Sequence, residues 1–429
     1  MRRLLTHPVF PLTFQIGMSL LLGVTLYFLF FGSQSDEYNP GSYLLWYIWW
    51  ASLPLTFLVL GRMWCSICPV GFFTELAQKI VPKRPLHWPK NLQRFEIILL
   101  ATSLLGIHFL NLWFSFEENI RTGGILILLL VGLSCILALL FQKRIWCRTF
   151  CPLGAFAGIM ANISIFRLKI NTKNCGKRCA GTICSSGASE TGKECPMGID
   201  VPQGIDPHFC SLCGKCLKDC SRDSIVTNWQ FPPKVVEPAS SSVQNSLAIL
   251  VFLGMSLDMS LYHLTDRPIF LWQLSKLLGV APSSWFEMTI HGLIIIFPAG
   301  WMMILARLGA SGEFFPERLA GVARPVLPLA ALAVIALNLM PLLIAGPMNL
   351  KTILLNAGYQ QFGWLDHVRY LEGLPLEIIQ AGLVGLGLAC VFREMSRVRI
   401  KWPLLTAAAI TYLIFGSIYL WVFHQPMIS

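Results

Sequence analysis

The sequence predicts an all-α polytopic membrane protein of about nine transmembrane helices, with a small cysteine-rich α+β domain inserted between them. The 429 residues are 55% hydrophobic and only 13% charged, whereas soluble proteins carry about 25% charged residues. Apolar runs of about 20 residues, the length that crosses a bilayer, recur along the chain. Of the 14 cysteines, all except Cys135 and Cys390 stand at the ends of these runs or in one long polar segment.

Nine apolar runs define the expected membrane helices. They lie near residues 10–32, 43–61, 96–115, 123–141, 246–263, 285–306, 325–345, 375–392 and 404–423. The apolar piece 149–165 is expected to form a short re-entrant or interfacial helix. The basic start and the first run are similar to a signal peptide, but the run is too long and no clear small-residue cleavage site follows. We therefore expect the first run to be a retained span.

The distribution of basic residues predicts the orientation. Lys and Arg concentrate in the loops after the second, fourth, sixth and eighth runs, whereas the first loop carries Asp36 and Glu37. Because basic loops stay inside, we expect the N-terminus and the cysteine-rich segment to be cytoplasmic and the C-terminus to be periplasmic. The expected location is a bacterial-type inner membrane, in contact with the lipid bilayer. The net charge of +11 falls mostly between spans, so no nucleic-acid partner is predicted.

Two Cys-Pro turns form an internal repeat. The first is Arg62-x-Trp64-Cys65-x2-Cys68-Pro69-x-Gly71, and the second is Arg144-x-Trp146-Cys147-x3-Cys151-Pro152-x-Gly154. Proline suits the first turn of a helix, where free N–H groups and the helix dipole favour thiolate. The four cysteines equal the ligand number of one cubane cluster. A third cluster or metal, a relay site and a docking structure are the readings that stay open, beside buried cysteines with no ligand.

The strongest motif is Cys210-x2-Cys213-x2-Cys216-x3-Cys220. This is the bacterial ferredoxin spacing, in which the fourth cysteine ligates the other cluster of a pair. A looser group lies upstream, namely Cys175, Cys179, Cys184 and Cys195, the last followed by Pro196. The crossover assigns one [4Fe-4S] cluster to Cys210, Cys213, Cys216 and Cys195, and the other to Cys175, Cys179, Cys184 and Cys220. A structural zinc site is the alternative for the upstream group.

The paired turns followed by this ferredoxin-type module resemble the NapH/NosR-type membrane iron–sulfur (polyferredoxin-like) electron-transfer proteins. They are also similar to the CcoG-type accessory family. The resemblance covers about residues 1–240, and one departure is that the first turn has two residues between its cysteines where the family usually has three. The resemblance implies electron transfer between the quinone pool and redox partners of respiratory reductases. Its CcoG-type branch implies a metal-reducing role in oxidase assembly.

The C-terminal half shows no family resemblance, and its few ionisable residues near spans are candidates because intramembrane charge is costly. A quinol site, a less favoured b-type haem, and a copper site with Met255 and Met259 are open readings, beside plain interfacial or hydrogen-bonded histidines. The candidates are His263, His291, Glu287 and Asp258, joined by His108 from the third span.

We expect three domains: a four-helix membrane domain at 1–165 with the two Cys-Pro turns, a cytoplasmic two-cluster ferredoxin-like domain at 166–243, and five membrane helices at 244–429. The expected function is electron transfer between the quinone pool, or another membrane redox partner, and a respiratory reductase system. Cytoplasmic or periplasmic electron-transfer proteins are the expected soluble partners. The chain is interpreted as a redox subunit without a complete substrate site. A copper reductase or assembly factor, and a scaffold or transporter with structural clusters, are the alternatives.

Overall fold

The computed structural model describes residues 1–35, 38–80, 86, 88–116, 119–141, 143–171, 175, 195–220, 223–230, 235, 243–262, 267–281, 283–309, 314–359, 373–398 and 402–425. The chain forms two compact units. Unit 1 comprises residues 1–31, 55–107 and 121–239, and unit 2 comprises residues 32–54, 108–120 and 240–429. The division into three domains stays a prediction.

The described residues contain nine helical segments that are long and apolar enough to cross a membrane. They are Leu12–Phe31, Pro40–Leu60, Glu96–Phe114, Ile120–Leu140, Val243–Tyr262, Ser284–Leu308, Phe315–Asn356, Leu374–Met395 and Pro403–His424. The predicted class, a multi-pass α-helical membrane protein, is therefore confirmed. The short apolar helix expected near 149–165 is present as α10 (Pro152–Ala161).

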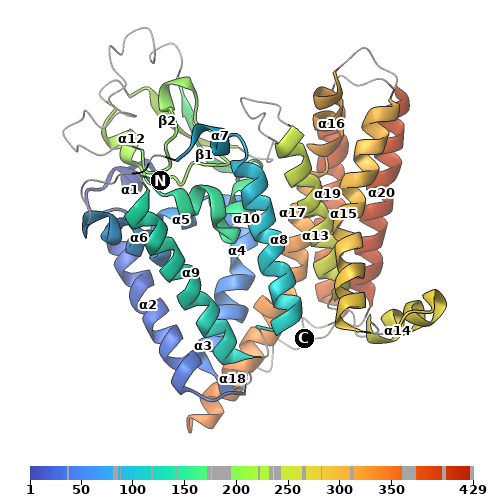
Figure 1. Ribbon diagram of the computed structural model, residues 1–429, viewed down its shortest axis with the longest axis horizontal. Helices are drawn as coiled ribbons and strands as arrows, with labels where there is room; N and C mark the ends of the chain where they lie inside the picture. The colour runs from blue at the N-terminus through green and yellow to red at the C-terminus, as the bar shows by residue number, and fades with distance from the viewer. Residues whose placement is uncertain are drawn as a thin grey trace. The chain divides into compact units, whose positions relative to one another are not determined.

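Unit 1 combines membrane helices with the cysteine-rich segment (Figure 1). The membrane-exposed faces remain apolar: only 11% of the best window in α8 and 22% of that in α9 is buried, as expected where lipid covers the helices. The helical elements of this unit are α1 (Arg2–Thr6), α2 (Leu12–Phe31), the end of α4 (Ala51–Leu60), α5 (Met63–Ile67), α6 (Pro69–Ile80), α7 (Lys90–Gln93), most of α8 (Glu96–Phe114), α9 (Ile120–Leu140), η3 (Trp146–Phe150), α10, η4 (Val201–Gln203) and α12 (Lys215–Lys218).

A two-stranded antiparallel sheet closes the cysteine-rich segment. Strand β1 (Phe166–Ile170) pairs with β2 (Ile225–Trp229), with Phe166 opposite Trp229, and their rings lie 4.9 Å apart. The buried side chains of both strands join a core with Leu5, Val201 and Leu217. The predicted small α+β element is therefore present, and the sheet brings the two ends of the segment together.

The first residues of the chain also pack against the cysteine-rich segment, at helix α12. Helix α1 packs against α12. Gly214 precedes α12, and a Cβ atom added to it would lie only 2.2 Å from the carbonyl oxygen of Leu5. Gly214 also has a φ of +75°, which side chains with a Cβ rarely adopt. Lys218 Nζ donates to the carbonyl of Phe10 at 2.8 Å. The first residue after Cys213 is thus a glycine for two independent reasons.

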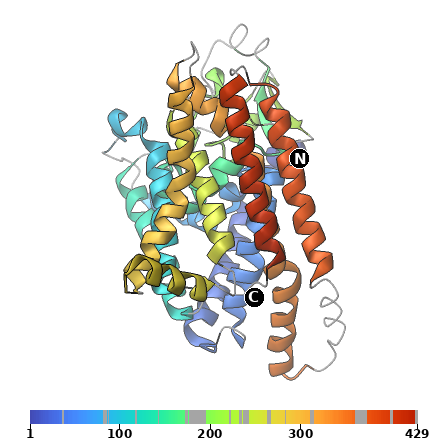
Figure 2. The ribbon, with the colours of Figure 1, turned by 90° about the vertical axis from the view of Figure 1, so that its right-hand side faces the viewer.

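Unit 2 is a helix bundle built around α13 (Val243–Tyr262) and α17 (Leu327–Met340). The best apolar window is 72% buried in α13, against 28% in α15, so α13 is central and α15 lies at the lipid-facing edge. Figure 2 shows α15, α19 and α20 running alongside one another. The other elements are α3 (Pro40–Ser42), η2 (Tyr43–Trp50), the start of α4, the end of α8, α14 (Arg267–Leu278), α15 (Ser284–Leu308), α16 (Phe315–Ala323), η5 (Pro341–Ala345), α18 (Gly346–Asn356), α19 (Leu374–Met395) and α20 (Trp402–His424).

Two features of unit 2 differ from the sequence prediction. The seventh apolar segment runs over Phe315–Asn356 rather than 325–345, because a π-helical turn at Pro341–Ala345 continues it into α18. Proline has no N–H to donate, so the regular α-helical ladder is interrupted there. The short helix α14 follows the fifth span and was not predicted.

The helices α13 and α15 cross in close contact at a glycine. A Cβ on Gly254 would lie 2.0 Å from the carbonyl oxygen of Ile295. Small residues at such crossings let two backbones approach in a membrane. The contact fixes the register of one helix against the other over the adjacent turns, which hold Asp258 and His291.

Candidate metal centre

The two Cys-Pro turns have the same local construction. Cys68 and Cys151 are both extended, with ψ angles of 133° and 116°, and the proline that follows each of them begins a helix, α6 or α10. The sulfur of Cys151 accepts the backbone N–H of Gly154 at 3.3 Å. Each turn therefore presents its second thiol to the N–H groups at the start of a helix.

The extra residue in the second turn is absorbed by a change of helix type. The first pair of cysteines is carried by the α-helix α5, whereas the second is carried by the π-helix η3. The N–H of Cys151 donates to the carbonyl of Trp146, five residues back, at 2.9 Å. A π-helical turn holds one residue more than an α-helical turn. The different cysteine spacings of the two turns thus correspond to an α-helical turn in the first and a π-helical turn in the second.

The two turns are bound to each other by a reciprocal pair of arginines. Arg62, from the first turn, donates to the carbonyl of Cys147 in the second at 2.9 Å. Arg144, from the second turn, donates to the carbonyl of Cys65 in the first at 3.2 Å. Both arginines are buried. The repeat in the sequence is therefore a pair of interlocked sites in space.

The glycine of each motif makes room for the arginine of the other. A Cβ on Gly71 would lie 3.2 Å from Nη1 of Arg144. A Cβ on Gly154 would lie 3.1 Å from Nη2 of Arg62 and 2.8 Å from the carbonyl of Cys147. The string Arg-x-Trp-Cys…Cys-Pro-x-Gly thus encodes one packing arrangement, used twice.

The four thiols of the turns lie within electrostatic range of one another. Burial first, and then the neighbouring thiols of Cys65 and Cys147, raise the pKa of Cys68 to about 12. Burial and the other three thiols likewise raise the pKa of Cys151. No three His, Cys, Asp or Glu side chains of the described residues converge as ligands of a single metal ion. In a cubane cluster each thiolate binds a different iron, so the four sulfurs lie farther apart than the ligands of a single metal ion do.

Arg144 connects the turns to the ferredoxin-type segment. Its guanidinium interacts electrostatically with the thiols of both Cys147 and Cys213, and its backbone N–H donates to the carbonyl of Pro196 at 2.9 Å. Cys147, Cys151 and Cys195 share one apolar cluster with Trp146 and Met197. The structure therefore places the second turn directly against the ferredoxin-type cysteines.

A second arginine reinforces this junction. Arg148 pairs with Glu96 at 2.6 Å and donates to the carbonyl of Gly198 at 3.2 Å. Its guanidinium also lies 4.9 Å from the ring centre of Phe209. Charges removed from water need partners of this kind. Arg148, in the second turn, thus contacts the start of α8 at Glu96 and the ferredoxin-type segment at Gly198 and Phe209.

Glu75 compensates the charge of Arg144, and its pairing is the basis of a pH prediction. Burial would raise the pKa of Glu75, but Arg144 at 2.8 Å and Lys215 at 3.5 Å outweigh it and lower the pKa. We expect Glu75→Gln to reduce stability by about 2 kcal/mol, a value discounted for the partial exposure of Glu75. A lowered pKa stabilises the folded state above the ordinary value of 4.5 and ceases to do so as the pH falls through the lowered value.

The check is the difference in apparent Tm between the wild type and Glu75→Gln over a pH series. The difference should stay constant from about pH 7 to about pH 5 and close only at lower pH. A difference that already narrows within that range would show that the pKa of Glu75 is raised, contrary to the pairing seen here.

The described ferredoxin-type cysteines sit in loops whose N–H groups point at sulfur. The Cys195 thiol accepts backbone hydrogen bonds from Met197, Gly198 and Ile199, and Ser224 donates to the sulfur of Cys220 at 3.2 Å. Leu212 (φ 54°) and Gly214 (φ 75°) have the left-handed conformation between the motif cysteines. Such turns form anion-binding concavities typical of Fe–S sites. The residues therefore fit a thiolate-ligated cluster.

Three of the described cysteines of this group interact electrostatically with one another, while the crossover assignment itself stays a prediction. The thiols of Cys210 and Cys213 interact with that of Cys195, and burial is the main cause that raises the pKa of Cys210 to about 12. Cys175, Cys216 and Cys220 are also among the described residues. Cys179 and Cys184 lie outside them, so only Cys175 and Cys220 of the second predicted ligand set are described.

His208 lies at this junction and was not predicted from the sequence. It is buried, its carbonyl accepts from Arg62, and a Cβ on Gly158 would lie 2.9 Å from its Nε2. Burial, and then Arg62, lower the pKa of His208 to about 3, so the imidazole is neutral. No periodicity or spacing in the sequence sets this histidine apart from the others.

In unit 2 the structure brings together three of the five predicted membrane candidates. Asp258 accepts a hydrogen bond from Nε2 of His108 and another from Nδ1 of His291, both at 2.7 Å. Glu287 lies one turn before His291 but is exposed. His263 lies outside the described residues.

Two segments, residues 43–87 and 124–173, match the family described as 4Fe-4S binding domain. An uncharacterized protein of Methanocaldococcus jannaschii is 29% identical over 193 residues, which cover 41% of this chain and 75% of that protein. The methylamine utilization ferredoxin-type protein MauN of Paracoccus denitrificans is 31% identical over 133 residues, 28% of this chain and 47% of MauN. The ferredoxin-type protein NapH of Escherichia coli is 23% identical over 189 residues, 40% of this chain and 64% of NapH. No solved structure matches the chain.

These findings define a multi-pass membrane protein that carries an iron–sulfur binding domain. More particularly, the chain is similar to ferredoxin-type membrane electron-transport proteins, as its paired turns predicted. The chain covers less than two thirds of MauN and of NapH. The resemblance to the CcoG-type branch stays a prediction.

Proposed function

We propose that the chain passes single electrons between the quinone pool, or another membrane redox partner, and a respiratory reductase system through two cytoplasmic [4Fe-4S] clusters. The supporting observation is the junction at Arg144, which interacts with one thiol of the Cys-Pro turns and one of the ferredoxin motif. Residues that approach so closely suit a relay from the membrane helices to the ferredoxin-type segment. Iron–sulfur clusters supply reversible one-electron chemistry when bound.

The ligands proposed for the first cluster are Cys210, Cys213, Cys216 and Cys195, of which three show mutual electrostatic contact. The second cluster is assigned to Cys175, Cys179, Cys184 and Cys220. The protein's own groups hold these sites through N–H donors to sulfur and through the left-handed loop at Gly214. Hydrogen bonds to sulfur and nearby positive charge are the means by which a protein sets cluster potential.

We further propose that Cys65, Cys68, Cys147 and Cys151 hold a third cluster or metal between the two turns. The argument rests on charge. Arg62 is fully buried and donates hydrogen bonds to the carbonyls of His208 and Cys147, and the carboxylate of Asp206 also interacts with it electrostatically. A buried cation needs nearby negative charge. Metal-bound thiolates of the turns would add to the negative charge around Arg62, whereas four neutral thiols would not. Each matched iron–sulfur segment contains one of the turns.

Anaerobic purification tests both ligand sets. We expect Cys213→Ser to remove a dithionite-reducible EPR signal and about four iron atoms per chain. The double variant Cys68→Ser/Cys151→Ser should remove about four different iron atoms and leave that signal in place. The control is Cys135→Ser, in a span and outside every proposed ligand set, which should keep the full iron content.

Two results would count against these proposals. Full iron and sulfide content in the double variant would remove the third site. Clusters that cannot be reduced reversibly in the wild type would favour the reading of a scaffold or transporter with structural clusters. Reduction of added copper by the purified protein, without oxidation of quinol, would favour the metal-reductase reading.

A further inference from the structure

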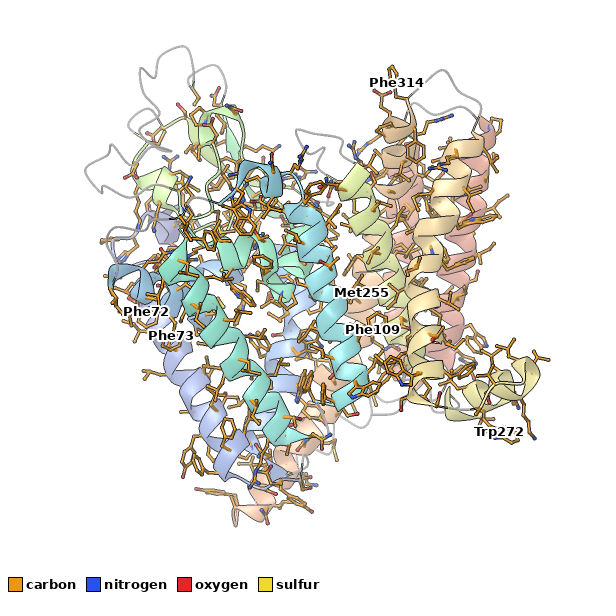
Figure 3. All side chains as sticks on the ribbon, in the orientation of Figure 1. Phe72, Phe73, Phe109, Met255, Trp272 and Phe314 are labelled. Atoms are coloured by element: carbon orange, nitrogen blue, oxygen red, sulfur yellow. The ribbon has the colours of Figure 1, made fainter. Side chains whose placement is uncertain are left out.

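The buried group of unit 2 is a His–Asp–His cluster, formed by His108, Asp258 and His291. The carboxylate of Asp258 is 0% exposed, the side chain of His291 is 6% exposed and that of His108 is 11% exposed. An ionisable triad inside membrane helices is costly and is seldom kept without a function. In Figure 3, Phe109 follows His108 and Met255 precedes Asp258 by one turn, so these two labels mark where the triad lies.

The hydrogen bonds fix which nitrogen of each imidazole is free. An ionised carboxylate can only accept, so His108 donates from Nε2 and His291 donates from Nδ1. In the neutral imidazoles the opposite nitrogens, Nδ1 of His108 and Nε2 of His291, then carry lone pairs. A carboxylate behind an imidazole orients the ring as a base and stabilises the imidazolium that forms. Asp258 does this for two histidines at once.

The backbone holds this geometry in place. Gly254 and Asp258 are one turn apart on α13, and His291 and Ile295 are one turn apart on α15. The close approach of Gly254 to the carbonyl of Ile295 therefore fixes the pairing of Asp258 with His291. A cluster set by backbone contact is preorganised rather than assembled on demand.

Two aromatic rings flank the cluster, and His108 is its least buried member. The rings of Phe109 and Tyr262 lie 5.9 Å from those of His108 and His291, respectively. Glu287 is exposed on α15 and is the other carboxylate near His291 on that helix. The partly exposed edge is at His108, on a helix whose best window is only 11% buried. His108 is thus the member of the cluster that a ring compound dissolved in the bilayer would meet first.

We propose that the His–Asp–His cluster binds and deprotonates a membrane quinol, an inference that rests on the proposed electron-transfer function. The quinol breaks two O–H bonds in succession. Nδ1 of His108, the less buried histidine, takes the first proton, releases it to water and then takes the second, and Asp258 stabilises the imidazolium each time. The two electrons leave singly to one-electron acceptors of the iron–sulfur class, and the quinone remains. Asp258 is a positioning residue, because it acts through the imidazole of His108.

Haem and copper fit the arrangement less well. A haem held between the two histidines would need their facing nitrogens, and Asp258 occupies both of them. A copper ion near Asp258 would need several ligands directed at one point. The described residues include no group of three His, Cys, Asp or Glu side chains arranged to hold a metal ion. Stoichiometric haem or copper in the purified protein would overturn the quinol assignment.

The experiment uses the anaerobically purified full chain, with decylubiquinol and menadiol as probes. We expect His108→Gln to slow quinol-driven cluster reduction by about 100-fold or more, as for loss of a general base. His291→Gln, which removes one hydrogen bond that positions Asp258, should slow it less. Dithionite should still reduce the clusters fully. Asp258→Asn should slow the rate as His108→Gln does while it changes the Kd for decylubiquinone by less than about threefold, which a merely structural role would not do. A rate of His108→Gln within about threefold of wild type would overturn the proposal.

A measurement on the wild type keeps the proposal testable if the variants fold poorly. Decylubiquinone should protect His108 from diethyl pyrocarbonate, as read by mass spectrometry. The control is His424, which pairs with Glu377 at the exposed end of α20 and should be modified equally with and without the probe. Equal modification of His108 would overturn the inference. Clusters that dithionite cannot reduce would sink the proposed function instead, and the protection result would then decide the quinone site on its own.

Discussion

Replacing Arg62 with methionine should remove the iron that we propose for the Cys-Pro turns and lower stability by about 3–5 kcal/mol, as expected for loss of one partner from a buried polar network. The side chain is fully buried and donates to the carbonyls of Cys147 and His208. Without the guanidinium, both carbonyls are left buried without their donor, which adds a desolvation penalty. The apparent Tm of the purified protein should fall by about 10 °C, and iron analysis should show the loss directly.

Two further variants make this result specific. Arg62→Lys keeps the charge but lacks the planar fork that reaches two carbonyls, so it should recover only part of the stability. Arg94→Met, at an exposed arginine, should leave both the Tm and the iron content unchanged. If Arg62→Met lowered the Tm by less than about 2 °C, the reciprocal arginines would not be what holds the two turns together.

The second large effect is expected at the crossing of α13 and α15. Gly254→Ala would place a methyl group 2.0 Å from the carbonyl oxygen of Ile295, and backbone atoms cannot turn aside as a flexible side chain can. The helices must separate, at a cost of about 3 kcal/mol or more. Their separation also pulls Asp258 away from His291. Both the yield of folded protein and its apparent Tm should fall.

The matched control lies on the same pair of helices. Gly300 is also in α15, but a Cβ there meets nothing within 4 Å. Gly300→Ala should therefore be neutral or slightly stabilising, because alanine has the higher helix propensity by about 1 kcal/mol. Equal losses in the two variants would indicate a general need for glycine in α15 and α13 and would contradict the close-contact explanation.

Much of this architecture could be predicted from the sequence because hydropathy and spacing are local signals. The runs near 10–32 and 404–423 correspond to the helices Leu12–Phe31 and Pro403–His424. The rarity of ionisable residues near spans also marked His108, Asp258 and His291 as candidates, and the structure joins the two histidines through Asp258.

The remaining features depend on contacts between distant parts of the chain. Hydropathy does not give the rotation of a membrane helix about its axis. The sequence therefore could not predict that His291 is buried and Glu287, one turn away, is exposed. The bond of Arg62 to the carbonyl of Cys147 joins residues of two repeats. The packing of Leu5 on Gly214 joins the beginning of the chain to the ferredoxin motif. Neither contact leaves a periodic trace in the sequence.

The exchange of arginines between the turns has an evolutionary consequence. In a chain with a single turn, the arginine would lack the carbonyl acceptor that the other turn provides here. A second molecule of the same kind would have to provide that acceptor. Two such molecules related by a dyad would satisfy each other symmetrically. Joining them in one polypeptide makes the partnership permanent and frees each half to diverge, as the different cysteine spacings of the two turns illustrate.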